Sequence, residues 1–213
     1  MGGSLPMDFS VKSFEVGPVA ANCYILKDND SNEGMVIDPG GNPDKILSAI
    51  KEMGVEVKLI ALTHGHFDHI GGLDKVKKAL NVPVAIHEAD GEMLTDAKKN
   101  LSAFVGAPGE MEKADVLLKD DDNISFGGCS LKVIHTPGHT PGGVCFYGGG
   151  ALFSGDTLFA GSVGRTDFPG SSTEDILDSI RNRLAKVSDA TKVFPGHGPA
   201  STMGIERETN PFF

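Results

Sequence analysis

The chain has 213 residues, of which 39% are apolar, so it is long enough for one large domain or two small ones. Its formal net charge of −10 argues against a nucleic-acid partner, because phosphate contacts need clustered lysine and arginine residues that the sequence lacks. The same charge argues against an electrostatic membrane role.

The cysteines and the N-terminus indicate the compartment. Cys23, Cys129 and Cys145 are far apart and form no Cys-x-x-Cys pair, so we expect buried, reduced thiols. No apolar stretch approaches the roughly eighteen residues of a membrane-spanning helix, and no signal-peptide pattern is present. We expect a soluble, cytoplasmic protein with one domain over residues 8–213. Residues 1–7 are expected to be disordered or left over from cloning.

Short strands open the chain. Apolar runs over residues 11–16, 23–26 and 35–37 are separated by turn residues. The third run ends at Asp38. Its carboxylate either caps the turn or accepts a hydrogen bond from a metal-binding histidine.

A strand–helix–strand unit follows. A helix is predicted over residues 43–53, with Asn42 as its N-cap and a glycine as its stop. It leads into an apolar strand over residues 57–62. An amphipathic helix over residues 73–80 and a strand over residues 82–86 come next.

The strongest chemical signal lies between these elements. Residues 63–72 read Thr-His-Gly-His-Phe-Asp-His-Ile-Gly-Gly, directly after the strand over residues 57–62. Imidazole and carboxylate groups crowded in this way repel, hydrogen-bond or share a cation, and a metal is the simplest solution. His64 and His66 are two residues apart and point the same way, while the turn carries Asp68 and His69 round. One segment can thus serve two adjacent metals.

The pattern weakens after the strand over residues 82–86. His87 ends this strand and is either an outlying ligand or, as we favour, the cap of the next helix. Residues 88–112 are the least regular part of the sequence and are a candidate for the wall of the site.

The second half repeats the alternation of strands and turns. His139, Asp156 and His197 each follow a strand in a turn stiffened by glycine or proline. His135 is expected to be a packed strand residue. Strands are predicted over residues 124–126, 130–135, 144–147, 151–154 and 192–195, and a helix over residues 173–184.

Five histidines and two aspartates therefore follow strand ends, a set that suits two divalent metals. Zinc is expected first, with iron or manganese as alternatives. Two zinc ions, two aspartates and a bridging hydroxide leave the cluster about one unit positive, which favours a small anionic substrate. The residues are His64, His66, Asp68, His69, His139, Asp156 and His197.

The expected chemistry is metal-assisted hydrolysis. Coordination lowers the pKa of water from about 15.7 to near 7, and a second metal polarises the substrate oxygen. No serine or cysteine nucleophile is required. Esters, thioesters, amides and phosphoesters all remain open as substrates.

Four motifs, in this order, resemble the metallo-β-lactamase superfamily, and the resemblance runs from about residue 8 to the end of the chain. It implies an α+β fold, the αβ/βα four-layer sandwich, in which two mixed β-sheets face each other with helices outside and the dinuclear site at one edge. The motifs are Thr-His-Gly-His-Phe-Asp-His (63–69), Thr-Pro-Gly-His-Thr-Pro-Gly (136–142), Ser-Gly-Asp-Thr-Leu-Phe (154–159) and Pro-Gly-His-Gly (195–198).

Within the superfamily, Gly-Arg-Thr-Asp-Phe at residues 164–168 and the ending over residues 206–212 resemble the short bacterial hydroxyacylglutathione hydrolases, or glyoxalase II. Superfamily lactamases usually carry cysteine where Asp156 stands, which argues against β-lactams. The resemblance implies one metal held by His64, His66 and His139, a second held by Asp68, His69 and His197, and Asp156 as the bridge.

The resemblance implies hydrolysis of S-lactoylglutathione or related acyl thioesters by a bridging hydroxide. A thiolate, with a thiol pKa of about 8.5, can leave without a dedicated general acid. Asp68 either orients the hydroxide and accepts its proton or acts only as a ligand. Arg165 either meets a substrate carboxylate or, as we favour, pairs with an acid such as Asp167. Full-length glyoxalase II binds glutathione through a helical C-terminal region, whereas this sequence ends sixteen residues after His197.

Two alternatives remain. Persulfide dioxygenases of the same superfamily share the Gly-Arg-Thr-Asp-Phe stretch and bind one iron, here through His64, His139 and Asp156. They consume oxygen and glutathione persulfide. A non-enzymatic interaction module is disfavoured because such relatives lose ligands.

Overall fold

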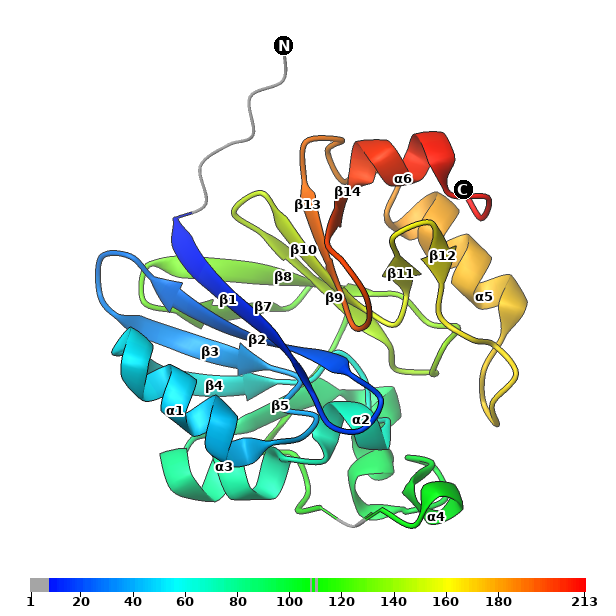
Figure 1. Cartoon of the computed structure of the whole chain (residues 1–213). Coiled ribbons are helices and arrows are strands. Elements are labelled where there is room, and N and C mark those ends of the chain that lie inside the picture. The colour runs from blue at the N-terminus through cyan, green and yellow to red at the C-terminus, as the bar shows by residue number, and fades with distance from the viewer. Residues whose placement is uncertain (1–7, 108, 110) are drawn as a thin grey trace.

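The computed structural model describes residues 8–107, 109 and 111–213, so the prediction for residues 1–7 lies outside the described residues. Two mixed sheets face each other (Figure 1). The first has the order β1-β2-β3-β4-β5-β6, with antiparallel pairs as far as β3 and parallel pairs beyond it. Its strands are β1 (Phe9–Val16), β2 (Ala21–Asp28), β3 (Glu33–Ile37), β4 (Glu56–Ala61), β5 (Val84–His87) and β6 (Val116–Leu118).

The second sheet has the order β14-β13-β10-β9-β8-β7. A separate two-stranded hairpin of β11 (Leu158–Phe159) and β12 (Ser162–Val163) follows β10. The strands of the second sheet are β7 (Asn123–Phe126), β8 (Cys129–His135), β9 (Val144–Gly148), β10 (Ala151–Gly155), β13 (Lys192–Pro195) and β14 (Ser201–Thr202).

Helices cover the outer face of each sheet (Figure 1). The first sheet carries α1 and α3, and the second carries α5 and α6. None of the helices described here has both the length and the apolar character that crossing a bilayer requires. The helices are α1 (Pro43–Met53), α2 (Phe67–Ile70), α3 (Leu73–Leu80), α4 (Ser102–Val105), α5 (Thr173–Asp178) and α6 (Met203–Thr209), with a 3₁₀ segment (Glu88–Thr95) and a π-helical segment (Ser179–Arg183).

Alternation along β2 explains the layering. Side chains of successive strand residues point to opposite faces. Tyr24 and Leu26 face the second sheet, and the ring of Tyr24 lies 5.3 Å from that of Phe153. Cys23 and Ile25 face the helices. Helix, sheet, sheet and helix therefore form four layers, which confirms the predicted αβ/βα sandwich.

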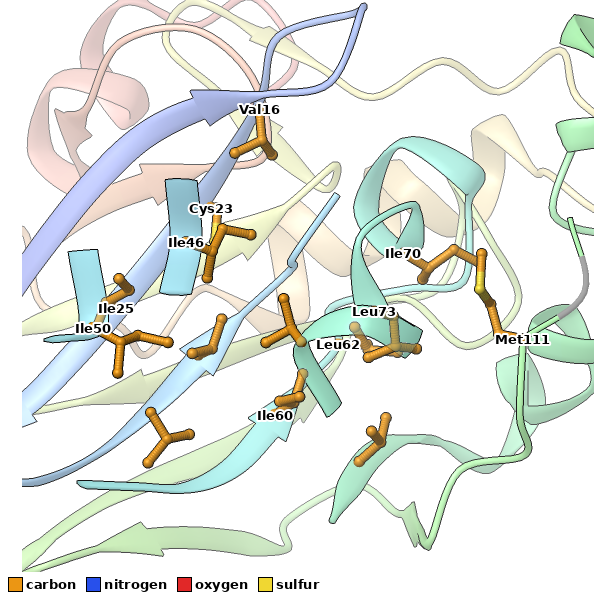
Figure 2. Packing of buried hydrophobic residues seen from close by; sticks show 14 of the residues in the cluster. Val16, Cys23, Ile25, Ile46, Ile50, Ile60, Leu62, Ile70, Leu73 and Met111 are labelled. Atoms are coloured by element: carbon orange, nitrogen blue, oxygen red, sulfur yellow. The ribbon is translucent and has the colours of Figure 1, made fainter. Parts of the chain in front are cut away.

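The helix-side core shows why α1 packs as it does. Ile46 and Ile50 are four residues apart and so share one face of the helix. Figure 2 shows this face turned toward Cys23 and Ile25 of β2, within a cluster of buried side chains. Burying each such aliphatic side chain contributes about 1.5–3 kcal/mol.

Asn42 occupies the predicted N-cap position of α1 but does not cap with its side chain. Its φ of 47° is left-handed, and its Oδ1 accepts from the Gly17 amide at 2.8 Å. The amide therefore ties α1 to the β1–β2 turn instead.

Only the first half of the helix predicted over residues 173–184 is α-helical, and most of the rest is a π-helix. It begins as expected, with the Ser172 hydroxyl accepting from the Asp175 amide. It widens to a π-helix at Ser179, whose hydroxyl donates to the Pro137 carbonyl at 2.8 Å. The sequence did not predict β6, the two-residue strands or α6, because these elements are too short for a periodic pattern to register.

Strand direction brings the predicted ligands together. In the first sheet β3, β4 and β5 are parallel, so their carboxyl ends share one edge. In the second sheet β8 and β10 run in the same direction, because β9 is antiparallel to both. β13 is parallel to β10 and so shares this direction. Ligands that follow these strands therefore converge on one edge of the sandwich.

Candidate metal centre

The structure brings all seven predicted ligand residues into one cluster at this edge. The segment after β4 supplies four of them, partly through the short helix α2. The turns after β8, β10 and β13 supply His139, Asp156 and His197. The cluster therefore draws on both sheets.

The first group is made of imidazoles. The ligand-capable nitrogens of His64, His66 and His139 lie within 4.8 Å of one another, and all three residues are buried. His66 Nδ1 faces His139 Nε2 at 2.9 Å. Two facing imidazole nitrogens either share one proton or both turn their lone pairs to a cation. The third nitrogen makes this a trigonal set that suits a metal.

The second group combines a carboxylate with two imidazoles. Asp68, His69 and His197 also place one ligand atom each within 4.8 Å. Asp68 Oδ2 lies 3.1 Å from His197 Nε2 and 3.7 Å from His69 Nε2.

Asp156 lies between the two groups. Its Oδ1 is 3.3 Å from His69 Nε2, and its Oδ2 is 3.4 Å from His139 Nε2 and 3.6 Å from His197 Nε2. One carboxylate thus faces both groups of candidate ligands.

The unpartnered atoms of the cluster test whether metals fit. Among the described residues, the buried side-chain nitrogen and oxygen atoms without a hydrogen-bond partner are His64 Nε2, His69 Nε2 and Asp156 Oδ1. An unsatisfied buried polar atom costs about 1–3 kcal/mol. All three point into the cluster, so a pair of divalent cations there would satisfy them. The donor set fits the metals it was predicted to hold.

Burial controls the protonation of these histidines. It lowers the pKa of His64 well below its ordinary value and that of His66 to about 3, and the neighbouring imidazoles add to the shift. For His69 burial works in the same direction, but Asp156, Asp68 and Asp38 outweigh it and raise the pKa. His64 and His66 are therefore neutral and ready to coordinate, since metals bind neutral imidazole.

We expect the metal-free protein to lose stability as the pH falls below about 6.5. Unfolded histidines take up protons near that pH, whereas His64 and His66 stay neutral in the folded chain, and His66 does so down to about 3. The pKa values of His69 and His197 are raised, so below about 6.5 these two histidines are protonated in both states and change the balance little. The unfolded state then binds more protons, and His64 and His66 each lower the free energy of unfolding by up to about 1.4 kcal/mol per pH unit. Urea unfolding of metal-free protein at about pH 7, 6 and 5 measures this slope. Equal stability at all three values would contradict it.

Asp38 fixes the orientation of His69. This fully buried carboxylate accepts from His69 Nδ1 at 2.9 Å, from the Thr63 amide at 2.8 Å and from the Thr63 hydroxyl at 2.6 Å. The bond at Nδ1 leaves Nε2 of His69 facing the cluster. Of the two roles predicted for Asp38, the structure shows the outer partner of a candidate ligand.

Arg165 acts in the site through its backbone. Its carbonyl oxygen accepts from His139 Nδ1 at 2.8 Å and so turns Nε2 toward the cluster. Its guanidinium makes two hydrogen bonds to Asp167, at 2.9 and 2.8 Å, and lies 4.4 Å from the ring centroid of Phe168. The favoured prediction, pairing with Asp167, is confirmed.

Asp90 is a site residue that the sequence analysis missed. Its carboxylate is fully buried and accepts from the Thr140 hydroxyl at 2.7 Å, the Gly142 amide at 2.6 Å and the Gly65 amide at 3.2 Å. It thereby joins the loop that carries His64 and His66 to the turn that carries His139.

We expect Asp90→Ala to lower the free energy of unfolding by about 2–4 kcal/mol, because three buried donors lose their acceptor. Metal affinity should fall about tenfold, since the first group of histidines is no longer held together. Chemical unfolding and zinc titration measure the two effects. Asp90→Asn keeps one acceptor oxygen and should show smaller losses. Unchanged stability in Asp90→Ala would show that the carboxylate does not hold the loops.

Asn22 plays a similar part for the last ligand. Its side-chain amide, in β2, donates to the carbonyls of Pro195 at 3.0 Å and Gly198 at 2.9 Å. These residues flank His197, so the first sheet positions a turn that the second sheet carries.

The remaining histidines and the cysteines lie outside the cluster. His87 Nδ1 accepts from the Ala89 amide at 3.3 Å, which confirms the predicted cap, and its ring stacks on that of His135 at 4.0 Å. All three cysteines are free and buried, as predicted. Burial raises the pKa of Cys145 to about 11, so this thiol is a poor nucleophile.

The cluster forms the floor of a cleft of about 650 Å³. Aromatic rings contact the candidate ligands edge to face. The ring centroid of Phe168 lies 5.6 Å from that of His66, and the ring centroid of Phe159 lies 6.0 Å from that of His197. Leu101 and Phe104 add to the walls. They belong to the irregular segment predicted as a candidate wall, and this expectation is confirmed.

Two facing mixed sheets therefore carry a cluster of histidines and aspartates at their common edge that could hold metal ions. A family model described as the Metallo-beta-lactamase superfamily matches residues 16–197. The chain belongs to this superfamily, as the sequence motifs predicted.

Two curated relatives extend the match over nearly the whole chain. The "Probable metallo-hydrolase YqgX" of Bacillus subtilis (strain 168) is 40% identical over 92% of this chain and 94% of its own length. The "Hydroxyacylglutathione hydrolase GloC" of Haemophilus influenzae is 32% identical over 94% of this chain and 97% of its own length.

Solved structures agree on the fold. The crystal structure of BLEG-1 B3 metallo-beta-lactamase superposes with a TM-score of 0.90 at 38% identity, covering 95% of this chain and 99% of that one. The structure of TTHA1623 in a di-iron-bound form gives a TM-score of 0.85 at 37% identity, covering 95% and 100%.

Proposed function

We propose that the chain is a dinuclear metal-dependent thioester hydrolase that resembles hydroxyacylglutathione hydrolase. The observation that carries the dinuclear assignment is Asp156, whose two oxygens face both groups of ligands. In this proposal His64, His66 and His139 hold one metal, Asp68, His69 and His197 hold the other, and Asp156 bridges them.

The metals would supply hydroxide at neutral pH and polarise the substrate carbonyl. The chain's own groups set the geometry for this chemistry. Asp38 and the Arg165 carbonyl hold His69 and His139 by their Nδ1 atoms, so each ring has one orientation. Asp68 lines the cleft beside His197. We assign it to ligation and to orienting the attacking oxygen.

The cleft favours a leaving group that departs as an anion. Apart from the proposed ligands, the titratable side chain on its described lining is that of Arg165, which cannot give up a proton at neutral pH. A thiolate leaves without protonation because the pKa of a thiol is only about 8.5. Similarity to a hydroxyacylglutathione hydrolase supports the same substrate class.

Zinc remains the proposed metal, with iron or manganese as alternatives, because imidazole and carboxylate accept all three. The di-iron form of a solved relative supports iron as a real competitor. We also keep the proposed cytoplasmic location, which the three free cysteines support.

A chelation experiment tests the hydrolase. Metal-loaded protein should cleave S-lactoylglutathione or a simple acyl thioester, chelation should abolish the activity, and zinc, iron or manganese should restore it. A chromogenic cephalosporin belongs in the same assay, because a solved relative is described as a B3 metallo-beta-lactamase. Cleavage of the cephalosporin without cleavage of any thioester would replace our proposal with β-lactam hydrolysis.

A further inference from the structure

The walls of the cleft indicate which chemical groups the substrate has beside its reacting bond, which the metal ligands do not indicate. One arm rises from the metal ligands along Leu101, Phe104, Phe159 and Phe168. Its surface is almost wholly hydrocarbon. Pockets of this kind bind apolar groups and use a few polar atoms for orientation.

Part of this wall is exposed although it is apolar. Phe104 is 71% exposed, Val105 57% and Val19 47%, and all three line the cleft. They form half of the large exposed apolar side chains among the described residues, and the others, Val116, Leu117 and Ile205, lie elsewhere. A gathered apolar patch beside a reactive site marks a binding surface.

The same arm offers little to a charged ligand. On its described lining the one cationic side chain apart from the proposed ligands is Arg165. Asp167 already accepts from Nε and Nη2, which form one edge of its guanidinium, and Phe168 covers its face. Glutathione carries two carboxylates and one ammonium group, and the arm offers these three charges only the remaining edge of one guanidinium that is already paired.

A second arm leaves the metal ligands in another direction. It shares Val19, Phe67, Asp68 and Val105 with the first arm. It continues along Gly17, Gly40 and Asn42. Backbone and amide groups give this arm a larger polar share than the first arm, although apolar groups still make up most of its lining. The thiol carriers of biological thioesters are amide-rich chains, which suit this polar arm better than the apolar one.

We infer that the cleft selects thioesters with an apolar acyl group, which lies against Phe104, Phe159 and Phe168, and that it does not require glutathione. This inference rests on the proposed thioester hydrolase. The scissile carbonyl lies over the ligands, the acyl chain follows the apolar arm and the thiol follows the polar arm. Lactoyl is small and carries a hydroxyl, so it uses little of the apolar wall.

The test is a series of N-acetylcysteamine thioesters with acetyl, butanoyl, hexanoyl and octanoyl groups on metal-loaded protein. The value of kcat/KM should rise about two- to threefold per added methylene, because each methylene leaves water on binding. S-lactoylglutathione should be a poorer substrate than the hexanoyl thioester.

Two single-residue variants test whether the apolar wall causes the dependence on acyl-chain length. Phe104→Ser should lower kcat/KM for the hexanoyl thioester about fivefold or more and flatten the dependence on chain length. Leu117→Ser removes another exposed apolar side chain, on β6, and should leave the whole series unchanged. Because both residues are exposed, neither variant should unfold the protein.

A binding measurement separates this inference from the proposed function. Product carboxylates from acetate to octanoate, titrated calorimetrically, should bind more tightly with each methylene, whether or not the protein turns over thioesters. Thioester cleavage with a flat acyl series, or with S-lactoylglutathione preferred over every apolar thioester, would overturn the inference and keep the hydrolase. If no thioester is cleaved, the proposed function fails, and equal affinity for all carboxylates would overturn the apolar arm as well.

Discussion

Asp156→Ala is expected to lower thioester hydrolysis by about three orders of magnitude or more, because several kcal/mol of charge stabilisation depend on the metal pair. The carboxylate faces His69 on one side and His139 and His197 on the other, at 3.3 to 3.6 Å. Without it the two groups of ligands lose their common member. Metal content should therefore fall together with activity, and elemental analysis beside a thioester assay measures both.

Cys145→Ala is the control for this substitution. Cys145 is buried in β9, the strand next to β10, which Asp156 follows. Its thiol contacts Thr136 Oγ1 at 3.4 Å rather than any proposed ligand. Activity should be retained. A fully active Asp156→Ala protein would contradict the dinuclear mechanism.

Asp38→Ala should destabilise the protein by about 3–5 kcal/mol, because it removes the acceptor of three buried donors, one of them on His69. The free Nδ1 of His69 would also let the ring turn, so metal affinity should fall about 10- to 100-fold. Asp38 is 1% exposed and accepts from Thr63 as well as from His69, so water cannot easily replace it. Chemical unfolding of metal-free protein and zinc titration of the folded protein separate the two effects.

Asp38→Asn is the matched control. Asparagine tolerates the left-handed φ of 51° at this position and keeps one acceptor oxygen. It should therefore recover part of the stability but little of the metal affinity, because the charge opposite His69 is gone. Wild-type zinc affinity in Asp38→Ala would show that His69 needs no outer partner.

The ligand cluster could be predicted because each member repeats one local pattern. A strand ends, a glycine or proline turn follows, and a histidine or aspartate projects from it. The pattern is contained within about ten residues, as in the segment from Thr63 to Gly72. Parallel strands then bring such ends together without any further information.

Apart from Asp38, the groups that hold the ligands in place could not be predicted in the same way. Asp90 lies 25 residues from Gly65 and 50 from Thr140, and in the sequence it looks like one more surface acid. Asn22 lies 173 residues from Pro195. Arg165 contributes a backbone carbonyl, which every residue possesses. These roles arise from tertiary contacts alone, so they cannot be predicted from composition or from the spacing of residues in the sequence.

The most direct test of the account is the metal content of protein purified without added metal, measured together with cleavage of S-lactoylglutathione and an acyl thioester and with oxygen uptake on glutathione persulfide. The account predicts close to two metals per chain, thioester cleavage and no oxygen uptake. One iron per chain, with oxygen consumption and no thioester cleavage, would contradict it and assign the cluster to a persulfide dioxygenase.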